Sequence, residues 1–153
     1  MKFMSALRIS PYLGCKDWCL IENFTFEYRD IIFVVPMGFI TDGASVPRVF
    51  WNVLPPWGMY SPAAVGHDWL YYNQSTTKDF ADEALLDGMK ALGTPILESD
   101  IIYEAVSHFG QSAWDENKKK KDIGFIRVAQ DIPTSVFDTA FYWKGTTGNW
   151  KKG

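Results

Sequence analysis

Two helical segments follow each other with only a short polar turn between them, and this arrangement limits the possible folds more than any other feature. Residues 61–73 begin with Ser and Pro, a pair typical of a helix start, and carry apolar side chains at helical spacing. The second helix is predicted from Thr77, its N-cap, to Leu92, with Gly93 at its C-terminal end. Because the turn has about four residues, we expect an antiparallel helix pair.

The segment before these helices has the pattern of β-strands. Residues 20–28 alternate and residues 31–35 form an apolar run, with Arg29 and Asp30 between them, so a β-hairpin or small antiparallel sheet is expected. Residues 41–60 then contain three Pro and two Gly. This density of Pro and Gly predicts an irregular loop.

The rest of the chain is predicted to add one more helix and an extension. Residues 99–110 carry apolar side chains on one helical face. The lysine run at 118–121 is interpreted as a solvated connector, and residues 125–129 as a strand-like piece before an aromatic tail. We therefore expect an α+β fold with a three-helix core. The 153 residues fit a single domain, with residues 35–110 as its core and 118–153 as a C-terminal extension.

His67 and Asp82 are expected to meet across the helix pair. His67 lies six residues before Asn73 and Asp82 five after Thr77, so their heights above the turn are ~9 and ~7.5 Å. If both face the interface, Asp82 accepts a hydrogen bond from the imidazole and holds His67 as a general base. Tyr71 lies one turn after His67 on the same face. The alternative is a buried polar network that only specifies helix packing.

Asp68 points away from His67 and is left for a different role. Together with Asp42, or with backbone carbonyls of the loop, it can ligate Ca²⁺, which prefers carboxylate and carbonyl oxygens. A cation beside a histidine-activated water is a hydrolytic arrangement. For Asp42 the alternative is an Asx-turn within the loop.

These residues resemble the helix pair of the phospholipase A2 superfamily, in particular the parvovirus capsid enzymes. The resemblance covers about a fifth of the chain, in the segments around 62–71 and 81–86. It implies that His67 is the base, Asp68 a calcium ligand, Asp82 the aspartate that orients His67, and Tyr71 a supporting donor. In place of the Gly-rich calcium loop of those enzymes, residues 55–60 contain one Gly.

A longer segment, roughly residues 35–110, resembles a family of uncharacterised domains common in bacteriophage and prophage genomes. The sequence motifs that carry the resemblance are Thr-Asp-Gly-Ala-Ser-Val-Pro at 41–47 and His-Asp-Trp-Leu-Tyr at 67–71. It implies a viral origin, with four polar positions as the common signature: Asp42, His67, Asp68 and Asp82.

Charge and composition narrow the classes of function. A net charge of −3 makes a nucleic-acid partner unexpected, and neither a membrane-spanning run nor a signal peptide is visible. Two hypotheses remain. The first is a hydrolase of lipid or other ester or amide substrates. The second is a non-enzymatic phage virion, tail-associated or host-interaction protein, with the aromatic C-terminal region contacting phage structural or host proteins. The expected location is accordingly the host cytoplasm or the phage virion.

Overall fold

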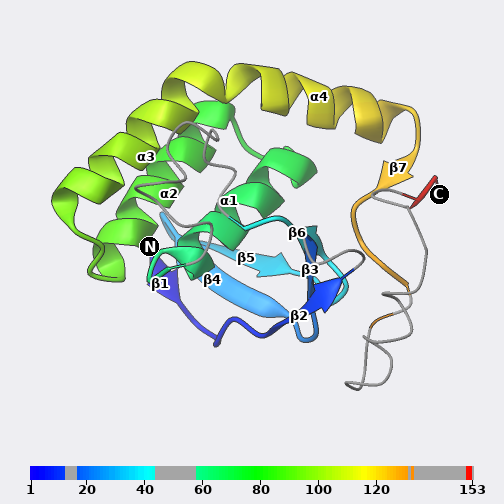
Figure 1. Ribbon diagram of the computed structural model, residues 1–153, viewed down its shortest axis with the longest axis horizontal. Coiled ribbons are helices and arrows are strands. Elements are labelled where there is room, and N and C mark those ends of the chain that lie inside the picture. Colours follow the sequence, from blue (N-terminus) through cyan, green and yellow to red (C-terminus); the bar gives the residue numbers. More distant parts are fainter. Residues whose placement is uncertain (13–16, 44–57, 131, 133–150, 153) are drawn as a thin grey trace.

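The computed structural model describes residues 1–12, 17–43, 58–130, 132 and 151–152. Its strands come first and form small antiparallel sheets, and its helices follow, so the predicted α+β class is confirmed. In the view of Figure 1, the helices gather above the sheets, with α1 (Ser61–Asn73) closest to the strands. Most of the irregular loop and the aromatic tail, at 44–57 and 133–150, lie outside the described residues.

The first sheet has the order β1-β4-β5 and contains the predicted hairpin. It consists of β1 (Lys2–Phe3), β4 (Phe24–Tyr28) and β5 (Ile31–Val35). Arg29 and Asp30 both have positive φ, 50° and 61°, which is the turn geometry that matches the twist of a two-residue hairpin. Residues on β4 alternate between buried and half-buried, so one face of the sheet packs on the helices.

The second sheet has the order β2-β3-β6. Its strands are β2 (Ile9–Tyr12), β3 (Asp17–Leu20) and β6 (Ile40–Thr41). The sequence pattern placed Leu20 in the same strand as Phe24, whereas the structure ends β3 at Leu20 and starts β4 four residues later. Leu20 donates its N–H to the carbonyl of Phe39, so it belongs to a different sheet from Phe24.

The first two helices have the predicted bounds and pairing. α1 ends at Asn73, and α2 (Lys78–Ala91) begins after Thr77, whose hydroxyl accepts the N–H of Phe80. Gly93 has φ +75°, a backbone conformation that favours glycine after a helix. The two helices pack against each other, which places one face of α1 against one face of α2.

The structure has four helices among the described residues where the sequence predicted three. α3 (Ile96–Phe109) starts three residues earlier than expected, and α4 (Gln111–Asp122) includes the lysine run that was interpreted as a connector. No residue of α4 is fully buried, so it has no apolar stripe that a periodicity search detects. Ion pairs four residues apart stabilise it instead, namely Lys118–Asp122 and Glu116–Lys120.

Rings of the first sheet pack against α1 to form the largest apolar core. Phe26 packs directly over Gly66 of α1, where an added Cβ would lie 3.1 Å from the ring. A second buried cluster lies between α1, α2 and α3. Its members are Tyr60, Ala63, Ala64, Leu85, Met89 and Ile102.

After α4 the chain returns to the sheets and brings Arg127 to the helices. β7 (Phe125–Ile126) pairs with β8 (Lys151–Lys152), and Val128 forms a bridge with Phe39. The carbonyl of Arg127 accepts the N–H of Ile40, which fixes the backbone of this segment beside β6. Within the described part of the chain, no helix has the length and apolar character needed to cross a membrane.

Candidate functional site

His67 and Asp82 form a direct hydrogen bond between α1 and α2. His67 Nε2 lies 2.8 Å from Asp82 Oδ1, and the two residues are 6% and 2% exposed. The short turn and the matched heights on an antiparallel pair predicted this contact, and the geometry agrees. Both helices are anchored by apolar packing on either side, so the pair is held in a fixed place.

Asp82 accepts two further hydrogen bonds. The Tyr71 hydroxyl donates to Oδ1 at 2.7 Å, and Lys78 Nζ donates to Oδ2 at 2.6 Å. Burial is the largest single influence and raises the pKa of Asp82, but the interactions with His67, Lys78 and Tyr71 together outweigh it and hold the pKa below its ordinary value. Asp82 is therefore an ionised carboxylate in the interior of the helix pair.

The charge on Asp82 fixes the proton arrangement of His67. An ionised carboxylate only accepts hydrogen bonds, so His67 Nε2 carries the hydrogen that it shares with Asp82. In the neutral ring, Nδ1 then keeps a lone pair that can accept a hydrogen bond or a proton. The Tyr71 ring lies against the imidazole with centroids 4.1 Å apart, which restricts rotation of His67.

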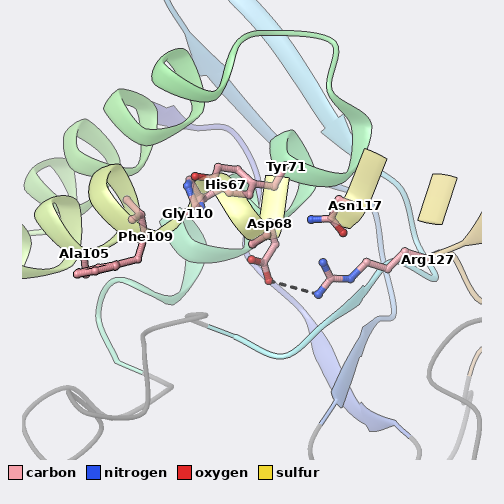
Figure 2. A pocket seen from close by; sticks show the side chains of 10 residues that line it. His67, Asp68, Tyr71, Ala105, Phe109, Gly110, Asn117 and Arg127 are labelled. Carbon is pink, nitrogen blue, oxygen red and sulfur yellow. Dashed lines mark ion pairs between the residues drawn. The ribbon is translucent and has the colours of Figure 1, made fainter. Parts of the chain in front are cut away.

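A pocket opens beside the imidazole. It has a cavity volume of about 100 Å³, and its walls come from α1, α3, α4 and the segment after α4. Figure 2 shows His67 and Tyr71 on one wall, with Asn117 and Arg127 on another. The lining residues are His67, Asp68, Tyr71, Ala105, Val106, Phe109, Gly110, Ala113, Asn117 and Arg127. The His–Asp pair is thus buried but not sealed.

Asp68 lines the same pocket and points toward Arg127 (Figure 2). The Thr41 hydroxyl donates to Asp68 Oδ2 at 2.6 Å, and Arg127 Nη2 lies 3.9 Å from the same oxygen. Burial, and to a smaller extent nearby Asp42, raise the pKa of Asp68 to about 7, although Arg127 and the Thr41 hydroxyl oppose the shift. Asp68 therefore changes its charge near neutral pH.

The two aspartates expected to bind calcium are joined by an arginine. Arg127 Nη2 lies 3.4 Å from Asp42 Oδ1 as well as 3.9 Å from Asp68, so a guanidinium occupies the position between the carboxylates. Calcium takes six to eight oxygen ligands, and the described residues include no cluster of three metal-binding side chains. With the guanidinium between the two carboxylates, these residues do not fit a calcium ion.

Sequence reasoning missed three residues of the site, namely Lys78, Arg127 and Asn117, the last of which lines the pocket from α4. Lys78 has a detectable signal, because it precedes Asp82 by four residues on a helix, a spacing that favours an ion pair. Arg127 has none, since it lies on a different element from every other residue of the site and is brought in only by the pairing of residues 127–129 with the strand region. His108, by contrast, is exposed on α3, pairs with Glu104 and does not line the pocket.

The fold and the site define an α+β domain with a buried ionised aspartate, a histidine and an adjoining pocket. Comparison with protein families matches residues 18–106, more than half of the chain, to the family described as "Protein of unknown function (DUF1353)". The chain therefore belongs to the DUF1353 family. The matched range includes His67, Asp68, Lys78 and Asp82, whereas Arg127 lies beyond it.

One curated relative is an uncharacterised protein, y4jT, from Sinorhizobium fredii. It is 36% identical over 94 residues, which cover 60% of this chain and 28% of the relative. The chain thus spans less than a third of that protein's length. No solved structure matches the chain significantly.

Proposed function

We propose that this protein hydrolyses ester or amide bonds with His67 as the general base. The observation that carries the proposal is that one imidazole makes two different contacts. Its Nε2 is hydrogen-bonded to buried Asp82, and the same ring lines an open pocket. A histidine whose role is only structural has no need of a pocket at its ring. The proposed function resembles the hydrolase hypothesis drawn from the helix pair, without its calcium ion.

The proposed reaction uses the lone pair on Nδ1. A water molecule in the pocket gives a proton to Nδ1 as its oxygen attacks the substrate carbonyl carbon, and Asp82 stabilises the imidazolium that forms. The tetrahedral intermediate collapses when the bond to the leaving group breaks and the imidazolium returns the proton to that group. Arg127 and Asn117 contribute N–H groups to the same pocket and are our candidates for contacting the oxyanion.

A panel of substrates tests the proposal. Purified protein is incubated with short-chain and long-chain nitrophenyl esters, with an amide substrate, and with phospholipid vesicles, and product release is followed. His67→Asn is expected to lower the rate on an accepted substrate by about 10²–10⁴-fold. The matched control is His108→Asn, because the chain has two histidines and His108 is exposed and does not line the pocket.

A second candidate function is supported by the hydrogen bonds of Asp82 and not by the pocket. Through His67, Tyr71 and Lys78, the carboxylate ties α1 to α2, and Lys78 also bonds to carbonyls of α3. In this alternative the network only specifies helix packing in a non-enzymatic phage or host-interaction protein. It is favoured if no substrate is hydrolysed and a pull-down from infected cells recovers phage structural or host proteins.

A further inference from the structure

Lys78 is the buried cation of the site, and the sequence reasoning gave it no role. It is the first residue of α2, and its side chain is 10% exposed. Nζ donates to Asp82 Oδ2 at 2.6 Å, to the carbonyl of Val106 at 3.1 Å and to the carbonyl of Ser107 at 3.2 Å. All three ammonium donors are thereby engaged, two of them by backbone at the C-terminal end of α3, where the helix dipole favours a positive charge.

The position of this ammonium group determines the charge that surrounds His67. Without Lys78, the imidazole would face an uncompensated buried carboxylate, which favours protonation of the ring. With Lys78 on the other oxygen, Asp82 and Lys78 together carry no net charge. The remaining groups around the ring are neutral Tyr71 on α1, the carbonyls of α3, Asp68 on α1, whose charge changes near pH 7, and Arg127 across the pocket.

We propose that Lys78 is a positioning residue that keeps His67 in its neutral form, with the proton on Nε2 and Nδ1 free to accept a proton. Lys78 does this through Asp82, since it contacts the carboxylate and not the imidazole. The hydrogen bond from Lys78 is also one of the causes that lower the pKa of Asp82. Only the catalytic consequence of the proposal rests on the proposed hydrolase function; the protonation state of His67 does not.

The test is the titration of the two histidine rings by long-range ¹H–¹⁵N NMR. In the unmodified protein, the ¹⁵N shifts of His67 are expected to show the Nε2–H tautomer at pH 7.5. In Lys78→Met, which keeps the length of the side chain and removes its charge, the midpoint of His67 protonation is expected to move up by about one pH unit or more. Lys78→Arg restores the charge and is expected to return the midpoint toward its original position.

Lys118→Met is the matched control. Lys118 also pairs with an aspartate four residues later, but that pair is exposed. Neither histidine is expected to change its titration in this variant, and His108 serves as an internal reference in every spectrum.

Two results would overturn the proposal. One is a folded Lys78→Met protein whose His67 midpoint is unchanged. The other needs no variant, and so covers the case in which Lys78→Met fails to fold: it is a His67 ring that carries its proton on Nδ1, or on both nitrogens, at pH 7.5. If no hydrolase substrate is found while the titration behaves as expected, the proposed function fails and the assignment of Lys78 stands.

Discussion

Asp82 is the residue on which the other side chains of the site depend. A carboxylate that is 2% exposed is costly unless its charge is compensated and its oxygens accept hydrogen bonds. Here Oδ1 accepts from His67 and Tyr71, and Oδ2 accepts from Lys78. Removing any one donor leaves part of a buried charge unsatisfied, so each donor contributes to stability as well as to the proposed chemistry.

Tyr71→Phe separates these two contributions. The ring keeps its contacts with His67 and Trp114, while the hydrogen bond to Asp82 is lost. We expect the free energy of unfolding to fall by about 1.5 kcal/mol or more, the range for a hydrogen bond to a charged group. Urea denaturation measures this loss. Any hydrolysis should fall less than in His67→Asn, because the base itself remains.

Tyr103→Phe is the control for this substitution. Tyr103 lies on α3, and no hydrogen bond of its hydroxyl is found within the described part of the chain. Loss of the Tyr103 hydroxyl is expected to change the free energy of unfolding by less than about 0.5 kcal/mol. Equal effects of the two substitutions would mean that the hydrogen bond to Asp82 contributes nothing measurable.

Among the secondary-structure elements, the junction between α3 and α4 packs directly against the site. Gly110 lies between the helices, and a Cβ built there would collide with the Tyr71 hydroxyl and with the carbonyl of Val106. Its φ is −72°, so the requirement for glycine comes from this close approach and not from backbone strain. The junction therefore helps to hold Tyr71 against Asp82.

Gly110→Ala is expected to displace the Tyr71 hydroxyl and to lower stability by about 1–3 kcal/mol, as overpacking of a filled site does. A double-mutant cycle with Tyr71→Phe checks the cause. Because Phe lacks the hydroxyl oxygen, Gly110→Ala should cost less in the Tyr71→Phe background than in the unmodified protein. Equal costs in the two backgrounds would assign the loss to the other close neighbours of the added Cβ, the carbonyl of Val106 and Lys78 Cε.

The edge strand β5 exposes apolar side chains on the outer face of the first sheet. Ile32 is 58% and Val34 47% exposed, and the strand contains no charged residue. Charges on an edge strand discourage pairing with other chains. Ile32→Lys is therefore expected to reduce concentration-dependent association, measured by light scattering, and it places a cation opposite Glu27 on β4.

Thr25→Lys is the matched control, since it adds the same charge to the same sheet face but on the internal strand β4. Its effect on association is expected to be smaller. Association that persists unchanged in Ile32→Lys would show that this edge is not the contact between chains.

How far the sequence predicted the elements depends on what stabilises each one. The hairpin, α1 and α2 carry strong local signals, namely alternation, helix caps and a short turn, and their bounds were predicted within a few residues. The fourth helix was missed because ion pairs and Trp114, rather than a buried stripe, stabilise it. Periodicity detects burial, so a helix without buried residues leaves no such pattern.

At the scale of the whole molecule, the site likewise contains contacts that local sequence patterns predict and contacts that they do not. The contact between His67 and Asp82 follows from two neighbouring helices, and arithmetic on their heights predicts it. Arg127 reaches Asp68 only because residues 127–129 pair with the region of residues 38–40 far back in the sequence. A long-range pairing of short segments leaves no periodicity, and this is why the sequence gives no sign of the guanidinium between Asp42 and Asp68.

The buried carboxylate of Asp68 links the stability of the whole molecule to pH. An aspartate in an unfolded chain has a pKa of about 3.9, whereas burial raises the pKa of Asp68 to about 7 in the folded protein. Between these values the folded state binds more protons than the unfolded state. The contribution of Asp68 to stability is therefore complete below about pH 4 and is lost as the pH rises through about 7.

Asp68→Asn removes this titration while keeping an oxygen that can accept from Thr41. We expect the stability of the variant, relative to the unmodified protein, to improve by at least about 1 kcal/mol between pH 5 and pH 8, measured by urea denaturation at each pH. Asp122→Asn, at an exposed ion pair, is the control and should show no such trend. A relative stability of Asp68→Asn that stays constant across this range would mean that Asp68 remains ionised throughout it. The carboxylate would then form a permanent ion pair with Arg127, and the pocket would carry the same charge at every pH in the range.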